Sequence, residues 1–527
     1  MIKKCAILVV FALMLLQMPI YAAYRSEPVA ATVRMDTTFW VFSEEDLFAA
    51  TSRINSLGAT NAVIHVWGNL ELTETVVVTG SNITIRFIGN GRTIRNNHGN
   101  TISVNGSTLI FENIIISGGG TGIRATGGST ITINNNSVIT NNGRHGVEMI
   151  GSSTLTVTNS VISHNQESGI HTDTANVSVL DSTIERNLDG ISVAGQTPTV
   201  IVRDSIIRNN RGRGILTHNT SNIAIYDSEI TGNTFDGVSG FNRTNITIND
   251  SSIEGNLRWG VRADRHSTVV VNRSTVENSG AHGIYARNSD VTVNNSSVNL
   301  NRGNGIYTLF WGCVVSCCPT PALQPIPTLA ANDVRVMYNT ESGFFIQGAV
   351  ATVQESTIAY NDVDGITLRG DVRSSINLRN SIVRENKACG IIAHMPADVN
   401  LYRSSVLANT LDGIVGYNHS SVVLDNSQIE GNLRLGIRVD RHSTLTANNS
   451  IVSANGTDGI YARNSDITVF GGAIRNSGIH GIRLVFMDCL GSCCQHGGQT
   501  IPVYDVQNVD FNGNSGSNIH RIGFPTN

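Results

Sequence analysis

The chain is poor in charged residues, aromatic residues and proline. Charged residues make up 14% of the sequence and aromatic residues 6%, whereas charged residues account for about 25% of an average soluble domain. Only 10 prolines occur in 527 residues, as a continuous sheet requires, because proline cannot donate a hydrogen bond to a neighbouring strand. Asn, Ser, Thr and Gly take the place of charge, which favours many short strands joined by tight turns.

Long apolar runs are absent beyond the first residues. Lys3 and Lys4 precede an apolar run over residues 5–16, and a pair of small residues follows at 22–23. This order is typical of a secretory signal peptide, and the run is too short to cross a bilayer. We therefore expect residues 1–23 to be a signal peptide and the protein to be secreted, periplasmic or at the cell surface, with no membrane insertion.

The charge balance disfavours nucleic acid as a partner. The formal net charge is −4, and loss of the two lysines with the signal peptide shifts it to −6. Nucleic acids and anionic membranes attract basic surfaces. We therefore expect no nucleic acid and no anionic membrane as the main partner, and we expect the protein to be a monomer.

A short repeat runs through most of the chain. Gly followed by an apolar residue recurs at steps of 21 to 25 residues, with one step of 38 between Gly305 and Gly343. Clear units are VLDSTIERNLDGI at 179–191 and INDSSIEGNLRWGV at 248–261. Each unit alternates apolar and polar residues and is rich in Val, Ile and Thr, which predicts strands. A unit this short cannot bury its apolar face alone, so stacked units must share one core.

Each unit has room for three short strands and three turns, and so for one coil that rises about 4.8 Å to the next. The repeated Asn would stack on the Asn of the next coil, and the side-chain amides would hydrogen-bond along the column. Glycine is expected where a turn needs positive φ or where two chain segments pass closely. A leucine-rich repeat is the rival fold, but its Leu-x-x-Leu-x-Leu pattern is missing.

With this pattern the sequence resembles the right-handed parallel β-helix repeat proteins of the pectate-lyase-like superfamily, with their Asn ladders. The resemblance covers about residues 60–520 and implies a fold, not an activity. We therefore predict an all-β protein, a right-handed parallel β-helix solenoid with a short N-terminal capping helix. Residues 24–59 are expected to form the N-terminal extension and helix, and residues 60–527 the solenoid.

The expected helix lies in SEEDLFAATSRINS, residues 43–56. Ser43 and Asp46 can form a capping box at its start. Its apolar residues then fall on one face; these are Leu47, Ala50 and Ile54. A solenoid needs such a cover, because an open coil exposes unpaired strand edges.

A duplication larger than the repeat is also present. IEGNLRWGVRADRHST at 253–268 matches IEGNLRLGIRVDRHST at 429–444, an offset of 176, and the octapeptide GIYARNSD recurs with the same offset. The offset also relates two Cys-x-x-x-Cys-Cys sets, in loops expected at 309–330 and 486–502. A block of seven coils with a Cys-bearing loop has therefore been copied.

The cysteines of an exported chain predict disulfide bonds. Three cysteines in each loop leave one over, so an intermolecular bridge or a free thiol stays open, and Cys389 is close enough in sequence to reach the first loop. Zinc is the alternative, but the second loop has His496 beside its cysteines, whereas the first loop has Pro319 and no His. We expect no metal and no cofactor.

One face of the solenoid carries the candidate site. The second and fourth residues after each Gly are expected to point into solvent, because strand side chains alternate. Arg, Asp, His and Tyr recur there in two copies, about 34 Å apart if seven coils separate them. The candidate ligand-binding residues are Arg262, Asp264, His266, Tyr285 and Arg287 in the first copy and Arg438, Asp440, His442, Tyr461 and Arg463 in the second.

Two interpretations of this face involve no catalysis. Asp264 and Arg287 sit one coil apart and can be a solvated ion pair worth little, in a purely structural surface protein. Alternatively, the face can bind an extended acidic or neutral polysaccharide or cell-surface glycan, with aromatic rings on sugars and arginines on carboxylates. Two copies would then hold one polymer bivalently. Polysaccharide recognition is our main hypothesis.

A polysaccharide lyase, epimerase or glycoside hydrolase of the same fold is the runner-up. A lyase needs a cation, a base and an acid, which an arginine of the face, His266 and Tyr285 can supply. The Asp-Pro-His of the alginate epimerases, the Arg-x-Pro-x-x-Arg of the pectate lyases and the Asn-Thr-Asp of the polygalacturonases are all missing. Glu148 and Asp173 can form a carboxylate pair that suits an inverting hydrolase. Catalytic residues, and whether the protein is an enzyme, stay open.

Overall fold

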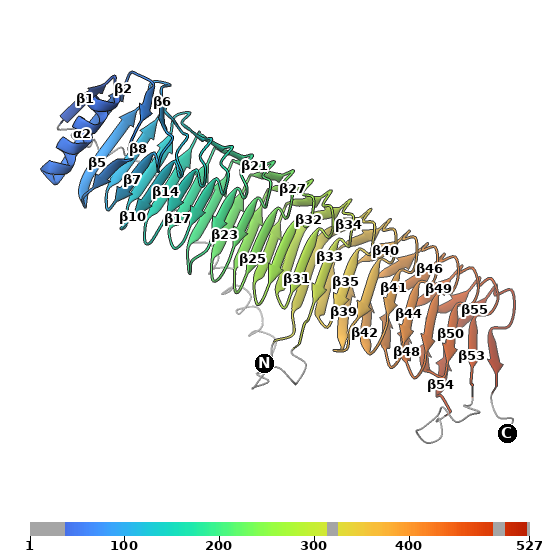
Figure 1. Ribbon diagram of the computed structural model, residues 1–527. Helices are drawn as coiled ribbons and strands as arrows, with labels where there is room; N and C mark the ends of the chain where they lie inside the picture. Colours follow the sequence, from blue (N-terminus) through green and yellow to red (C-terminus); the bar gives the residue numbers. More distant parts are fainter. Residues whose placement is uncertain (1–36, 313–324, 488–500, 524–527) are drawn as a thin grey trace, which may run out of the picture.

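The chain winds into a long parallel β-helix, shown as a computed structural model that describes residues 37–312, 325–487 and 501–523 (Figure 1). It has about 19 turns, which we call coils. The predicted all-β solenoid with a short N-terminal helix is confirmed. The expected signal peptide and all six loop cysteines lie outside the described residues. No helix among the described residues is long and apolar enough to cross a membrane.

Three short strands form each coil, as the length of the repeat predicts. A central coil consists of β26 (Asn245–Asn249), β27 (Ser252–Glu254) and β28 (Val261–Asp264). Each strand pairs in parallel with its counterpart one coil on: β26 with β29 (Thr268–Asn272), and β27 with β30 (Thr275–Glu277). Three parallel columns of strands therefore run along the whole solenoid.

The column of strands that follow the repeated Gly carries the candidate site, and we call it sheet B. Successive strands of sheet B are hydrogen-bonded neighbours in parallel. Its strands are β4 (Val76–Thr79), β7 (Ile102–Asn105), β10 (Ile123–Thr126), β13 (Val147–Met149), β16 (Ile170–Thr172), β19 (Ile191–Val193), β22 (Ile215–Thr217), β25 (Val238–Phe241), β28, β31 (Ile284–Arg287), β33 (Ile306–Leu309), β35 (Phe344–Gln347), β38 (Ile366–Arg369), β41 (Ile391–Ala393), β44 (Ile414–Tyr417), β47 (Ile437–Asp440), β50 (Ile460–Arg463), β53 (Ile482–Val485) and β56 (Ile519–Ile522).

Alternation along each strand separates the core from the surface. In β28, Val261 and Ala263 are 0% exposed, whereas Arg262 between them is part-exposed. The same pattern in every coil builds one continuous apolar column of Ile, Val, Leu and Ala. The prediction that the residue after Gly enters the core, and that the next residue points outward, is confirmed for β28 and β31.

The repeated Gly is needed because adjacent coils approach closely there. A Cβ atom on Gly237 would lie 2.7 Å from the carbonyl oxygen of Gly260 and 2.8 Å from Nδ2 of Asn256. Such distances are too short for any side chain. Close chain passage, one of the two expected reasons, therefore explains this glycine.

The repeated Asn forms the predicted ladder in the interior. Each side-chain amide donates to the Oδ1 of the next Asn at 2.8 to 3.3 Å in the first run and at 2.9 to 3.0 Å in the second. The first run is Asn142, Asn165, Asn187, Asn210, Asn233 and Asn256, and the second is Asn301, Asn339, Asn361, Asn386, Asn409, Asn432 and Asn455. Ser279 takes the place of Asn between the two runs.

The helix α2 (Glu44–Leu57) covers the N-terminal end of the solenoid beside β1 (Thr37–Val41) and β2 (Ala59–Val66) (Figure 1). Ser43 and Asp46 form the predicted capping box, and the predicted apolar face of the helix is buried. The helix therefore shields the first coil from water.

Asn233→Ala tests the ladder. Loss of the amide leaves the buried backbone N–H of Asn210 without its partner and removes one hydrogen bond from the side chain of Asn210 and one from that of Asn256, so the free energy of unfolding should fall by about 2 to 3 kcal/mol. Asn222→Ala is the matched control, because Asn222 is exposed and bonds only to Asn245 in its own surface ladder; its loss should stay below about 0.5 kcal/mol. Urea unfolding followed by circular dichroism measures both, and equal losses would contradict a stabilising ladder.

Candidate functional site

Aromatic side chains form a continuous stripe on the outer side of sheet B. Trp259 stacks on Tyr285, with ring centroids 4.9 Å apart. Tyr307 then meets Tyr285 edge-on at 5.4 Å and Phe345 at 4.8 Å. The guanidinium of Arg262 lies 4.6 Å from the ring centroid of Trp259. These side chains are part-exposed, so four successive coils present aromatic surface and one cation to solvent.

The second copy has a shorter version of the stripe. Tyr461 lies between two arginines, with guanidinium carbons 5.7 Å (Arg438) and 5.8 Å (Arg483) from its ring centroid. Arg438 also lies 5.0 Å from the ring centroid of Tyr417. Leu435 stands where the first copy has Trp259. In the first copy Arg262 likewise lies 4.6 Å from the ring centroid of Phe241, so an arginine packed on the aromatic ring of the preceding coil is common to both copies, whereas the tryptophan belongs to the first copy alone.

Asp264 lies beneath arginine side chains and does not face solvent. Arg287 of the next coil donates to it from Nε and Nη2 at 2.7 and 2.6 Å, and Nη2 of Arg262 donates at 3.1 Å. These hydrogen bonds raise the pKa of the Arg287 side chain. The predicted ion pair between neighbouring coils is confirmed. The expectation that Asp264 is open to solvent is wrong, because the two arginines cover it and leave it 0% exposed.

Asp440 repeats this arrangement in the second copy. Arg463 donates to it at 2.7 and 2.6 Å, Arg438 at 3.1 Å, and Asp440 is likewise 0% exposed. The expectation of a solvent-facing carboxylate is therefore wrong here as well. We call each arrangement of one buried aspartate and two arginines an Asp–Arg clamp.

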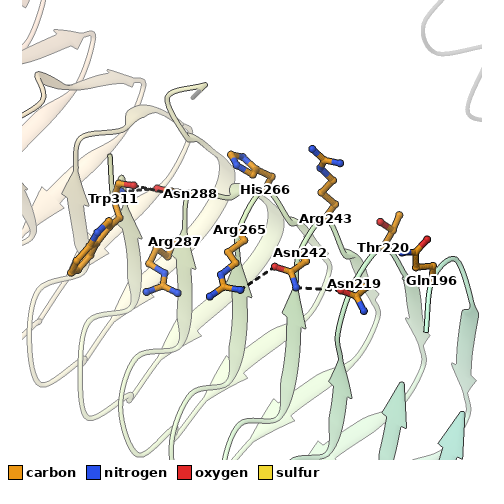
Figure 2. Close-up of a pocket in the computed structure, with 10 residues that line it drawn as sticks. All are labelled: Gln196, Asn219, Thr220, Asn242, Arg243, Arg265, His266, Arg287, Asn288 and Trp311. Carbon is orange, nitrogen blue, oxygen red and sulfur yellow. Dashed lines mark hydrogen bonds between the residues drawn. The ribbon is translucent and has the colours of Figure 1, made fainter. Parts of the chain in front are cut away.

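His266 lies apart from the clamp, at the corner where the chain leaves β28. Arg265 and His266 both have left-handed φ, 55° and 63°, and both side chains are exposed. They line a groove of about 630 Å³ along this corner (Figure 2). The groove residues are Gln196, Asn219, Thr220, Asn242, Arg243, Arg265, His266, Arg287, Asn288 and Trp311. We call it the corner groove.

His442 takes the corresponding corner of the second copy. It stacks on His419, with ring centroids 5.4 Å apart. Nη1 of Arg441 donates to Oδ1 of Asn418 at 3.5 Å, as Nη1 of Arg265 donates to Oδ1 of Asn242 at 3.4 Å. The corner geometry is therefore duplicated with the rest of the block.

The structure thus divides the predicted residues between two neighbouring surfaces. Arg262, Tyr285 and their counterparts belong to the stripe, His266 and His442 to the corner, and Arg287 touches both. Sequence reasoning missed Trp259, which precedes its Gly. It also missed Tyr307 and Phe345, although both stand at the second position after Gly that had already marked Tyr285.

The other candidate groups do not converge on a reaction centre. Glu148 is ion-paired with Arg124 at 2.9 Å and lies in register with His171, whereas Asp173 is exposed beyond β16. Cys389 is a free, buried thiol whose pKa burial raises to about 12; the loop cysteines that it was expected to reach lie outside the described residues. No cluster of His, Cys, Asp and Glu able to hold a metal ion occurs among the described residues.

Comparisons with known proteins concern the fold. The model of the family described as "Right handed beta helix region" matches residues 74–235, 216–317 and 328–474. A comparison with curated protein sequences found no match.

Several solved structures align with most of the chain. The periplasmic alginate epimerase AlgG covers 72% of this chain and 76% of its own, with 12% identity and a TM-score of 0.32. The Azotobacter vinelandii mannuronan C-5 epimerase AlgE4 A-module covers 93% and 98%, with 10% identity and a TM-score of 0.27. The PL6 family alginate lyase AlyGC covers 92% and 100%, with 10% identity and a TM-score of 0.30. At these values the likeness is one of fold alone.

Asp264→Asn tests the Asp–Arg clamp. A buried carboxylate that loses its charge leaves two guanidinium groups poorly matched, so the free energy of unfolding should fall by about 3 kcal/mol. Asp250→Asn is the matched control, because Arg273 holds Asp250 with the same 2.7 and 2.6 Å hydrogen bonds, but the side chains are 55% and 36% exposed. Its loss should stay below about 1 kcal/mol. Similar shifts of the two urea midpoints would contradict a special role for the buried clamp.

The pH dependence of stability tests the burial of His282 beside the stripe. Burial lowers its pKa to about 4, and its Nδ1 accepts a hydrogen bond from the backbone N–H of Asn304 at 3.0 Å. The unfolded chain therefore takes up this proton first, near pH 6.5. Above that pH the neutral His282 makes its full contribution to the free energy of unfolding. This contribution falls as the pH drops and is lost by about pH 4, and its total is up to about 3 kcal/mol.

His282→Gln should flatten the fall in unfolding free energy between pH 7 and pH 4. His98→Gln, at an exposed position, is the control and should leave the profile unchanged. Urea unfolding at a series of pH values measures both, and an unaltered slope in His282→Gln would contradict the buried neutral imidazole.

Proposed function

Since the chain belongs to the right-handed β-helix family, we propose that it recognises an extended extracellular polysaccharide through the outer face of sheet B. The observation that carries the proposal is the stripe of part-exposed aromatic side chains on four successive coils, with Arg262 among them. The proposed ligand-binding residues are those of the two copies, with the clamp aspartates acting through the arginines they hold.

The spacing of the stripe suits a linear chain of sugar rings. Each coil advances by about 4.8 Å, so Tyr285, Tyr307 and Phe345 offer a new contact at every step along the axis. Aromatic surfaces pack well against the apolar faces of sugars, while a Tyr hydroxyl stays available for hydrogen bonds. The hydroxyl of Tyr307 already donates to Oε1 of Gln347 at 3.1 Å, which fixes its ring.

Rigidity of the stripe favours binding. Arg262 is held by Asp264 at 3.1 Å, with its guanidinium 4.6 Å from the ring centroids of both Phe241 and Trp259. Burial raises the pKa of Tyr285, so its hydroxyl keeps its proton at neutral pH. A ligand would therefore order few side chains on binding, which lowers the entropic cost.

Two copies allow one polymer to be held at two points. The strands β31 and β50, which carry Tyr285 and Tyr461, are seven coils apart, about 34 Å along the axis. Once one copy has bound, binding of the second is effectively intramolecular. Polymers longer than this span should therefore bind more tightly than short oligosaccharides of the same composition.

The variant Tyr285→Ala/Tyr461→Ala tests the proposal. Loss of both rings should weaken binding of long polysaccharides by about tenfold or more. Tyr226→Ala/Tyr402→Ala is the matched control, because these part-exposed tyrosines are also related by the 176-residue offset, but they contact Arg203 and Arg379 on another face. Affinity electrophoresis through gels that contain polygalacturonate or dextran measures the retardation.

Unchanged retardation of the Tyr285→Ala/Tyr461→Ala protein would overturn the proposal. Failure of the native protein to bind any glycan would favour a structural surface protein instead. Unsaturated products or new reducing ends, released from the same polymers and abolished by His266→Ala, would show an enzyme of this fold.

A further inference from the structure

The corner groove differs in composition from the aromatic stripe. Arginines occupy three successive coils along it, because Arg243, Arg265 and Arg287 follow or end β25, β28 and β31. Asn219 and Gln196 continue the groove beyond Arg243, and Trp311 closes the other end (Figure 2). The groove is therefore a polar channel parallel to the solenoid axis.

The groove carries an excess of positive charge. None of the described residues that line it is acidic. The nearest clamp adds Arg262 and the buried Asp264, so four arginines face a single carboxylate and three positive charges remain unmatched in this group. The formal net charge of the chain is −4, yet arginine side chains are concentrated at this one corner of the solenoid.

Hydrogen bonds hold the lining in line with the axis. Nη1 of Arg265 donates to Oδ1 of Asn242 at 3.4 Å, and Nδ2 of Asn242 donates to Oδ1 of Asn219 at 3.4 Å (Figure 2). Asn288 donates from Nδ2 to the carbonyl oxygen of Trp311 at 3.0 Å and accepts from its backbone N–H at 2.6 Å. The backbone of Trp311, a residue that is 64% exposed, is thereby fixed at the end of the groove.

We propose that the corner groove binds a linear polyanionic glycan lying along the solenoid axis, with its anionic groups on the arginines of three successive coils. This inference rests on the proposed polysaccharide recognition and names the charge of the ligand. The groove spans five coil steps, about 24 Å, and guanidinium groups bind the oxygen atoms of anionic groups such as carboxylate and sulfate through charge-assisted hydrogen bonds. Trp311 supplies a ring for one sugar at its end.

The second copy provides a weaker form of the same groove. It keeps Arg441 and Arg463, but His419 stands in the place of Arg243 and Met487 in the place of Trp311. One permanent charge and one aromatic ring are therefore missing there. Polyanions bind first at the corner of the first copy.

Binding titrations with sulfated heparin, carboxylated polygalacturonate and neutral dextran test the proposal. The two polyanions should bind more tightly than dextran at 25 mM salt, and the difference should shrink at 250 mM salt because exposed charges are screened. Arg243→Gln/Arg265→Gln should weaken polyanion binding by about four- to twenty-five-fold, at roughly two- to fivefold per arginine, and should leave dextran binding unchanged. Circular dichroism confirms the fold of each variant.

Arg203→Gln/Arg379→Gln is the matched control, because it removes the same charge from exposed arginines on another face. His419→Arg provides the converse test and should strengthen polyanion binding roughly two- to fivefold. The sulfated and carboxylated probes show which anionic group the groove prefers.

Equal losses in the groove variant and the control variant would overturn the inference, because long-range charge would then explain the binding. An unchanged groove variant would overturn it as well, and so would single-stranded DNA that binds more tightly than either polyanion. These outcomes are distinct from failure of the stripe, which is read from dextran binding by Tyr285→Ala/Tyr461→Ala.

Discussion

The parallel pairing of each strand with its counterpart one coil on is the constraint from which the rest of the molecule follows. It fixes the rise per coil, brings every repeated Asn into line with the next, and leaves no space for a Cβ atom at Gly237. Because the buried amides bond only to one another and to the backbone, a shift of register by one residue would leave them all unsatisfied. The same register therefore places outward residues in straight rows along the axis, and the turn residues at each corner line up in the same way.

Local rules predict most of this fold from the sequence, because each coil is built from near neighbours. Alternation predicts the core, the Asn repeat predicts the ladder, and Ser43 with Asp46 predicts the helix start. The burial of Asp264 could not be predicted in this way. Its side chain leaves the strand on the outer side, and only the reach of Arg287 from the next coil and Arg262 from its own strand excludes water. Alternation describes the direction of a side chain, whereas burial depends on what neighbouring coils lay over it.

The candidate site was predicted in part for a similar reason. The repeated sequence around Tyr285 predicts a site from residues that occur twice, and the Asp–Arg clamps are indeed present in both copies with the same distances. The duplication does not indicate Trp259, because the second copy has Leu435 in its place. The copies thus agree at the clamps and differ at Trp259, Arg243 and Trp311. Arg243 and Trp311, which the second copy lacks, are therefore the positions at which the two corner grooves should differ in ligand preference.

A rigid, repetitive surface restricts the ligands that it can hold. Coil spacing cannot adjust to a bound polymer, because any stretch would break backbone hydrogen bonds along three columns at once. A glycan whose repeat differs from the coil rise therefore drifts out of step, and the mismatch grows with each coil. The three arginines of the corner groove occupy only three adjacent coils, so little mismatch accumulates along them. A row of charges along the whole solenoid would not tolerate such a mismatch. The coils between the two corner grooves also limit the mismatch. A polymer that has lost register at the first groove can bind the second groove in a new register. The spacing of the two sites is then a consequence of the duplication that also permits bivalent binding.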